Sequence, residues 1–141
     1  MAGKILKFED LDVFKCARQL TNEIFAVSEN TRVFKSFTLR DQMRRASISI
    51  MSNIAEGFEK RTTQEFIHFL YVSKGSAGEL RAQLMIANDQ SYLDNIKYNA
   101  LVDKSRKVSA MLSNFIKYLV QSKKNVSNVK RDDVQTEILC Q

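Results

Sequence analysis

The sequence predicts an all-α protein, an up-down-up-down antiparallel four-helix bundle that assembles as a homo-oligomer. Its 141 residues, a usual length for one domain, include no proline and only four glycines. Because these two residues interrupt helices most strongly, their scarcity favours long helices over a turn-rich β architecture. Apolar residues recur at three- and four-residue steps in four segments, which is the period of an amphipathic helix. The short connections between these segments favour antiparallel neighbours.

The first helix is predicted over roughly residues 11 to 30. Asp10 or Asp12 precedes the first apolar positions and is the expected N-cap. The core-facing stripe of this helix consists of Phe14, Ala17, Leu20, Ile24 and Val27. This is the pattern of an ordinary amphipathic helix with one buried face.

The second helix is predicted to begin at Thr38, with Asp41 completing a capping box, and to end at Gly57 as a C′ glycine. Its core-facing stripe consists of Leu39, Met43, Ala46, Ile50 and Ile54. A second apolar stripe lies roughly opposite and consists of Ile48, Met51 and Ala55. A monomeric bundle would leave this second stripe in water, so we expect another surface to cover it.

The third helix is predicted from Thr62 or Thr63 to about Asn88, and Thr62 and Glu65 match a capping box. Its core-facing stripe consists of Phe66, Phe69, Leu70, Ser73, Ala77, Leu80, Leu84 and Ala87. Behind this stripe lie Gly75, Gly78 and Ala82. Because an interior glycine costs a helix about 1 kcal/mol relative to alanine, the two glycines predict that another backbone approaches closely there. Symmetric self-association would supply that backbone.

The fourth helix is predicted to begin at an Asp94 cap and to fade near Ser122. Its core-facing stripe consists of Leu101, Val108, Leu112, Phe115 and Leu119. The bundle is thus expected over residues 1–122. Residues 123–141 have mixed charge and few large apolar side chains, which predicts a disordered or weakly helical tail.

Polar stripes run beside the apolar ones on the second and third helices. Two interpretations of these residues are open. The first is a catalytic or ligand pocket built from Arg45, Asn53, Glu56, Glu79 and Gln83. The second, which we favour, is a satisfied polar network at a helix or subunit interface, formed by Arg45, Ser49, Asn53, Glu56, Ser76, Glu79 and Gln83. In such a network Arg45 would pair with Glu79, or Glu56 with a basic group, because a buried charge without a partner is expensive.

The chain carries 22 lysines and arginines against 16 acidic residues, a net charge of +6 that weakly favours polyanions. Basic residues gather at the start of the second helix and along the fourth. The residues expected to contact nucleic acid are Arg40, Arg44, Lys104, Lys107 and Lys117. Arg44 is expected to point outward. In an oligomer these residues would repeat by symmetry into a basic ring or groove, although a solvated charged face is the alternative.

The sequence lacks the parts of standard enzyme sites, so we expect neither catalysis nor a cofactor. Glu65 and His68 have the spacing of a di-iron ligand pair, but His68 is the only histidine, so we expect no metal. Cys16 and Cys140 lie far apart without a CxxC motif, which favours a reduced, cytoplasmic protein. No apolar run is long enough for a membrane anchor, and the charged N-terminal residues do not match a signal peptide.

A resemblance to a known family rests on two stretches, FEDLDVFKCARQL and LRDQMRRASISIMSNIAEGFEKRTTQEFIHFLYVSKGSAGELRAQL. From about Phe8 to Leu119 the chain resembles the four-helix-bundle proteins found in intervening sequences of bacterial 23S ribosomal RNA genes. The matching motif positions are Gln42, Arg44, Arg45, Ser49, Asn53, Glu56, Gly57, Gly75, Ser76, Glu79 and Gln83. The resemblance implies a ring-like pentamer. It also implies a likeness in architecture to an accessory protein of diversity-generating retroelements that binds nucleic acid and a reverse transcriptase.

The leading hypothesis from the sequence is therefore a non-enzymatic, pentameric helical scaffold that binds RNA or a nucleoprotein partner through repeated basic surface. The alternative is a protein–protein interaction module whose positive charge serves solubility alone. A third hypothesis is an enzyme acting on an acidic small molecule near Arg45 and Glu79. A steep salt dependence of nucleic-acid affinity distinguishes the first from the others.

Overall fold

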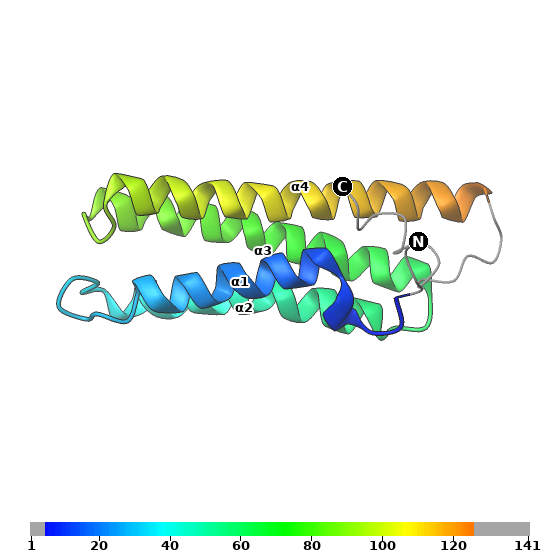
Figure 1. The fold of residues 1–141 in the computed structure, drawn as a ribbon, viewed down its shortest axis with the longest axis horizontal. Helices are drawn as coiled ribbons and strands as arrows, with labels where there is room; N and C mark the ends of the chain where they lie inside the picture. The colour runs from blue at the N-terminus through cyan, green and yellow to red at the C-terminus, as the bar shows by residue number, and fades with distance from the viewer. Residues whose placement is uncertain (1–4, 126–141) are drawn as a thin grey trace.

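A computed structural model describes residues 5–125, which form four long helices after one short turn (Figure 1). A 3-10 turn, η1 (Phe8–Asp10), precedes the first of them. The helices are α1 (Asp12–Val27), α2 (Phe37–Phe58), α3 (Thr63–Asp89) and α4 (Asn95–Asn125). Residues 5–125 contain no strand, and the all-α prediction is confirmed.

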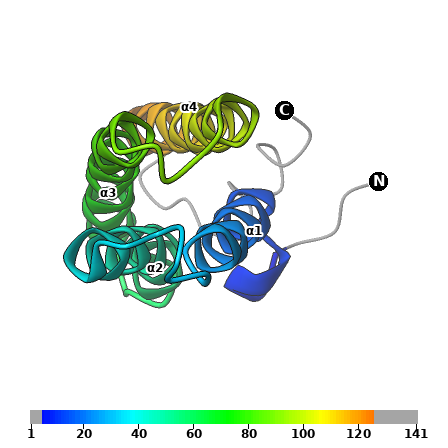
Figure 2. The ribbon, with the colours of Figure 1, turned by 90° about the vertical axis from the view of Figure 1, so that its left-hand side faces the viewer.

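Consecutive helices lie side by side along one axis, and the chain reverses direction at each connection (Figure 1). Seen along this axis, α2, α3 and α4 follow one another around the bundle (Figure 2). An ion pair between Glu23 of α1 and Lys104 of α4 joins the first helix to the last. At one end, the ring of Phe34 from the α1–α2 connection lies 4.9 Å from the ring of Tyr92 in the α3–α4 connection.

The core is a single cluster of apolar side chains from all four helices. The predicted stripes are largely buried. Val27 and Leu39 are half-buried and pack against the core, and Phe69 is half-buried. Phe66 of α3 meets Phe115 of α4 edge to face, with ring centroids 5.3 Å apart, so these two helices share the centre of the core.

The starts of α1 and α2 differ from the prediction. Leu11, and not Asp10 or Asp12, is the residue that precedes α1, and it provides no side-chain cap. Asp12 is the first helical residue, where its negative charge interacts favourably with the helix dipole. Ser36 caps α2, since its Oγ accepts a hydrogen bond from the backbone N–H of Leu39 at 3.1 Å. The prediction of Thr38 as the cap is therefore wrong.

The starts of α3 and α4 agree with the sequence. Thr62 and Glu65 form a complete capping box, with the Glu65 N–H donating to Thr62 Oγ1 at 3.1 Å. Asp94 Oδ1 accepts a hydrogen bond from the backbone N–H of Lys97 at 2.7 Å.

The predicted end of the bundle at residue 122 is too early, because α4 continues to Asn125. Lys123 Nζ donates a hydrogen bond to Gln64 Oε1 on α3 at 2.9 Å, which holds this last turn against the bundle. The basic side chains of Lys123 and Lys124 also suit a helix C-terminus. The expectation of a disordered tail falls on residues 126–141, outside the described residues.

Gly57 is a packing glycine inside α2 and not the C′ residue that the sequence predicted. A Cβ placed on Gly57 would lie 2.7 Å from Phe69 Cβ and 2.9 Å from Phe66 Cδ1, both on α3. None of the described glycines has a positive φ. The position therefore requires glycine because α2 and α3 approach closely there, and not because the backbone is left-handed.

Gly75 and Gly78 have no such neighbour among residues 5–125. A Cβ on Gly75 would meet nothing within 4 Å, and one on Gly78 would meet only the Arg81 guanidinium at 3.8 Å. The close backbone neighbour predicted for these glycines is therefore not supplied by residues 5–125.

We predict that Gly57→Ala lowers the free energy of unfolding by about 1–3 kcal/mol, because the added methyl group overpacks the α2–α3 contact. Gly75→Ala is the matched control and, in the dissociated chain, is expected to raise stability by about 0.5–1 kcal/mol through helix propensity. Urea denaturation followed by circular dichroism measures both values. Equal effects of the two substitutions would contradict this packing, and a concentration-dependent loss in Gly75→Ala would place a second chain against that glycine.

Candidate functional site

The structure brings three residues of the predicted polar network together where α2 packs on α3. Ser49 Oγ and Ser76 Oγ lie 2.8 Å apart, and Asn53 Nδ2 donates to the carbonyl oxygen and to the Oγ of Ser49. One turn away, the buried Ser73 Oγ donates to the Ile50 carbonyl oxygen at 2.8 Å. Hydrogen bonds from hydroxyl groups thus connect the two helices. The hydroxyl and amide groups that take part find their partners within this chain.

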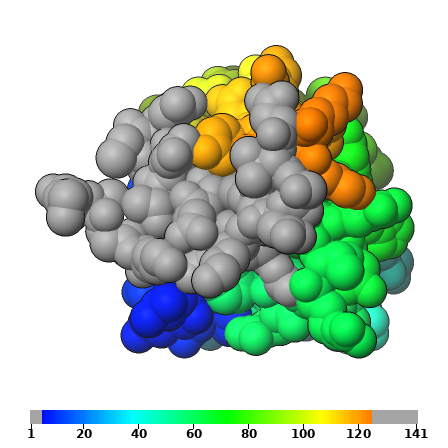
Figure 3. All heavy atoms as spheres, turned by 90° about the vertical axis from the view of Figure 1, so that its right-hand side faces the viewer, coloured from blue at the N-terminus to red at the C-terminus, as the bar shows by residue number. Residues whose placement is uncertain are grey.

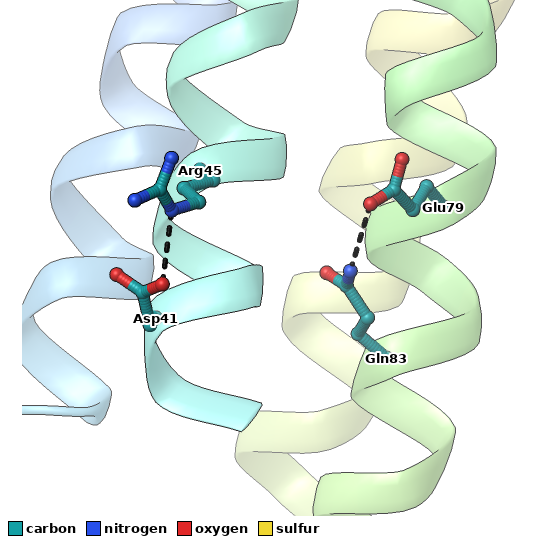
Figure 4. A network of polar contacts seen from close by, with 4 residues as sticks. All are labelled: Asp41, Arg45, Glu79 and Gln83. Carbon is teal, nitrogen blue, oxygen red and sulfur yellow. Dashed lines mark hydrogen bonds and ion pairs between the residues drawn. The ribbon is translucent and has the colours of Figure 1, made fainter. Parts of the chain in front are cut away.

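The charged members of the network pair along their own helices (Figure 4). Arg45 Nε donates to Asp41 Oδ2 at 2.9 Å, and Gln83 Nε2 donates to Glu79 Oε1 at 3.0 Å. The side chain of Arg45 is 73% exposed. The expected Arg45–Glu79 pair does not form within this chain, because a partner one turn away is reached without crossing between helices.

Glu56 completes the set, and its Oε1 lies 3.8 Å from Nζ of Lys60, four positions later and just beyond the end of α2. A catalytic or ligand pocket would require Arg45, Glu56 and Glu79 to converge on one point. The structure instead places each of them at the surface beside a residue four positions away in the sequence. Contact of these groups with a second chain stays a prediction.

Arg44, predicted to point outward, is instead half-buried against the end of α1. Its Nε donates to Ser28 Oγ at 2.9 Å, its Nη2 donates to the Phe25 carbonyl oxygen at 3.3 Å, and its guanidinium lies 4.5 Å from the Phe25 ring centroid. The prediction is wrong because the carbonyl groups in the last turn of α1 need donors, and Arg44 supplies one to the Phe25 carbonyl oxygen.

Two further basic candidates also have partners within the chain. The Arg40 guanidinium lies 5.2 Å from the ring centroid of the exposed Phe37. Lys104 forms the ion pair with Glu23 that joins α4 to α1. Lys107 and Lys117 are exposed and make no ion pair within residues 5–125.

Lys117 lies on a groove between α3 and α4, which we call the lysine groove. Its volume is about 620 Å³. It is lined by Tyr71, Lys74, Ser113, Ile116, Lys117, Val120, Gln121 and Lys124. None of these residues is acidic, and within the described chain none of the three lysines has an ion-pair partner.

The groove follows from the helical repeat of α4 and its position beside α3. Its α4 residues recur at steps of three and four, which places them on one face. At the end of the bundle, the last turns of α4 in orange lie beside the first turns of α3 in green (Figure 3). The aliphatic stems of lysines can cover apolar groups such as Ile116 and Val120 while the ammonium groups stay in water.

Sequence analysis missed Lys74, which is half-buried on α3 and lines the groove. Its signal in the sequence is weak, because Lys74 and Tyr71 lie only on the flank of the predicted core stripe. Their shared role depends on which side of α3 meets α4, and residue spacing on one helix does not define that side.

The second apolar stripe of α2 is only partly exposed. Ile48 is exposed, whereas Met51 and Ala55 pack against the core. The prediction that this whole stripe is exposed is therefore wrong, and Ile48 is its one exposed residue. The larger exposed apolar set lies on α3 and consists of Tyr71, Val72, Met85 and Ile86.

The remaining chemistry of residues 5–125 is sparse. His68 is exposed and packs edge to face with Phe69, and no group of three or more potential ligand side chains is placed there to hold a metal ion. Cys16 is a half-buried free thiol, while Cys140 lies outside the described residues. Among the described helices, none has the length and hydropathy needed to span a membrane.

Comparison with known proteins agrees with the resemblance seen in the sequence. A crystal structure of a protein of unknown function from the S23 ribosomal protein family of Bacteroides thetaiotaomicron superposes with a TM-score of 0.70. It is 22% identical, and the match covers 74% of this chain and 95% of that one, which supports the fold. No curated protein matches. The family model of the 23S rRNA-intervening sequence protein matches residues 9–114, and the chain therefore belongs to this family.

Proposed function

We propose that this protein is a non-enzymatic, homo-oligomeric helical scaffold that binds RNA through the lysine groove. The observation that carries this proposal is the convergence of Lys74, Lys117 and Lys124 on one groove without an acidic residue. Lysine ammonium groups are the common partners of phosphates in nucleic-acid binding. Tyr71, which is 56% exposed at the same groove, offers a ring on which a base can stack.

The proposed RNA surface is narrower than the basic set that the sequence predicted. Lys117 stays in it, whereas Lys107 is exposed on α4 outside the groove lining. Arg44 and Lys104 leave it, because both stabilise contacts of α1. A lysine with no intramolecular partner gives up less when it binds a phosphate than one that must first break an ion pair.

Self-association would multiply this surface. Val72 and Ile86 are exposed on α3 along the side that also carries Gly75, where a Cβ added to the glycine would have no contact within 4 Å. A symmetric partner would cover these side chains and bring several grooves onto one assembly. The ring-like pentamer implied by the family resemblance is the form that we propose, with RNA contacts repeated on each subunit.

The same exposed apolar residues support a second candidate function, a protein–protein interaction module that binds no nucleic acid. Val72 and Ile86 are of the kind that a protein partner covers. The two functions differ in their response to salt, because apolar contacts are not screened as phosphate contacts are.

We predict that the protein binds labelled structured RNA with an affinity that falls about 20- to 40-fold between ~50 and ~200 mM salt, for three phosphate contacts. Replacing Lys74, Lys117 and Lys124 together by glutamine should remove nearly all of the slope of log affinity against log salt, a reduction of about 2 to 3. Fluorescence anisotropy measures both quantities.

The matched control replaces Lys15, Lys35 and Lys97 by glutamine. These lysines are also exposed and lie outside the groove, so the net charge changes by the same amount. The control should keep most of the salt slope. Equal losses in the two triple variants would show that binding follows net charge alone, and an absence of binding at low salt would favour the protein-only module.

We also predict that Val72→Glu combined with Ile86→Glu reduces the mass of the assembly to that of one chain, because the charges cannot be buried without partners. Light scattering after size exclusion measures the mass, and circular dichroism checks the helix content. Ile96→Glu is the control, since Ile96 is 83% exposed near the start of α4. An unchanged mass in the double variant would remove this face from the assembly.

A further inference from the structure

We infer that residues 132–139 of this chain, DDVQTEIL, bind the lysine groove and compete with RNA for it. The contact itself stands independently of RNA binding, whereas the competition rests on the proposed function. The lysine groove is the surface, and an acidic, partly apolar segment of the same chain is its occupant.

The groove has the chemistry of a site for an acidic amphipathic segment. Lys74, Lys117 and Lys124 give it three positive charges, with no acidic residue in its lining. Ile116 and Val120 give it an apolar surface between those charges. A ligand that matches both features needs carboxylates beside aliphatic side chains.

Residues 132–139 have this composition. They contain three acidic residues and no basic one, and the acidic residues are Asp132, Asp133 and Glu137. Val134, Ile138 and Leu139 are the apolar ones. Asp133 and Glu137 are four positions apart, as are Val134 and Ile138, which is the spacing that places each pair on one side of a helical turn.

The chain is long enough to make this contact. α4 ends at Asn125, and Lys124 in its last turn already lines the groove. From Asn125 back to Lys117 the distance along α4 is about 12 Å at the usual helical rise. Residues 126–131 connect Asn125 to the segment 132–139 and can span about 20 Å when extended. The segment can therefore fold back beside α4 within the same chain.

Such a contact would regulate the groove. Carboxylates on the three lysines would occupy the positions that RNA phosphates need, so RNA would bind only the fraction of molecules with an open groove. High salt would weaken both contacts, because each depends on the same lysines.

A nitroxide label on Cys140, in full-length protein carrying Cys16→Ala, tests the contact without RNA. We expect the methyl signals of Ile116 and Val120 to lose most of their intensity, and those of Ile48 on α2 to keep theirs. Replacing Asp132 and Asp133 by asparagine and Glu137 by glutamine should restore the groove signals, as should the triple glutamine variant of the groove lysines. The triple variant of Lys15, Lys35 and Lys97 should not restore them.

Groove signals that are equally weak with and without the three carboxylates would overturn the inference, since tethering alone would then explain them. Weakening seen only between separately labelled chains would also overturn it, because the tail of a second copy would then hold the groove. In the RNA titration, neutralising the carboxylates should raise affinity several-fold at low salt. If RNA does not bind at all while the label still reports the contact, the proposed function fails and the docked segment stands.

Discussion

The close packing of α2 on α3 is the contact on which the rest of this bundle depends. Gly57 lets the α2 backbone come so near to α3 that an added methyl group would overlap Phe66 and Phe69. Hydroxyl groups then bridge the helices, with Ser73 bonded to the Ile50 carbonyl and Ser49 to Ser76. Because both contacts lie along one face of α3, they set the rotation of that helix about its own axis.

The rotation of α3 decides what its other faces do. Phe66 meets Phe115 on the side of α4, where Ser105 Oγ also donates to the Ala77 carbonyl oxygen. The flank with Tyr71 and Lys74 then lies against α4 and completes the lysine groove. The outer face, which includes Gly75 and Ile86, is left exposed. Different faces of α3 thus pack in the core, line the lysine groove and form the exposed surface that we propose a second chain covers.

The basic residues fall into two groups, those with a partner inside the chain and those without an ion-pair partner in the described residues. Their position in the sequence does not predict the group. Arg44 of α2 donates hydrogen bonds to residues at the end of α1. Lys104 of α4 forms an ion pair with Glu23, which also lies on α1. Both therefore stabilise the position of α1, while Lys117 and Lys124 stay available to a ligand. The sequence showed where positive charge accumulates, but the partner of each side chain comes from helices distant in the chain.

Apolar periodicity was enough to predict the four helices and most of their core stripes, and the spacing of Thr62 and Glu65 predicted the capping box, because these features depend on neighbours within one or two turns. Tertiary structure decided the features that depend on contact between helices. Gly57 became a packing residue through Phe66 and Phe69, Arg44 turned inward to the Phe25 carbonyl, and Lys74 joined a groove with α4. A helical repeat tells which side chains share a face, but only the packed bundle decides what each face meets.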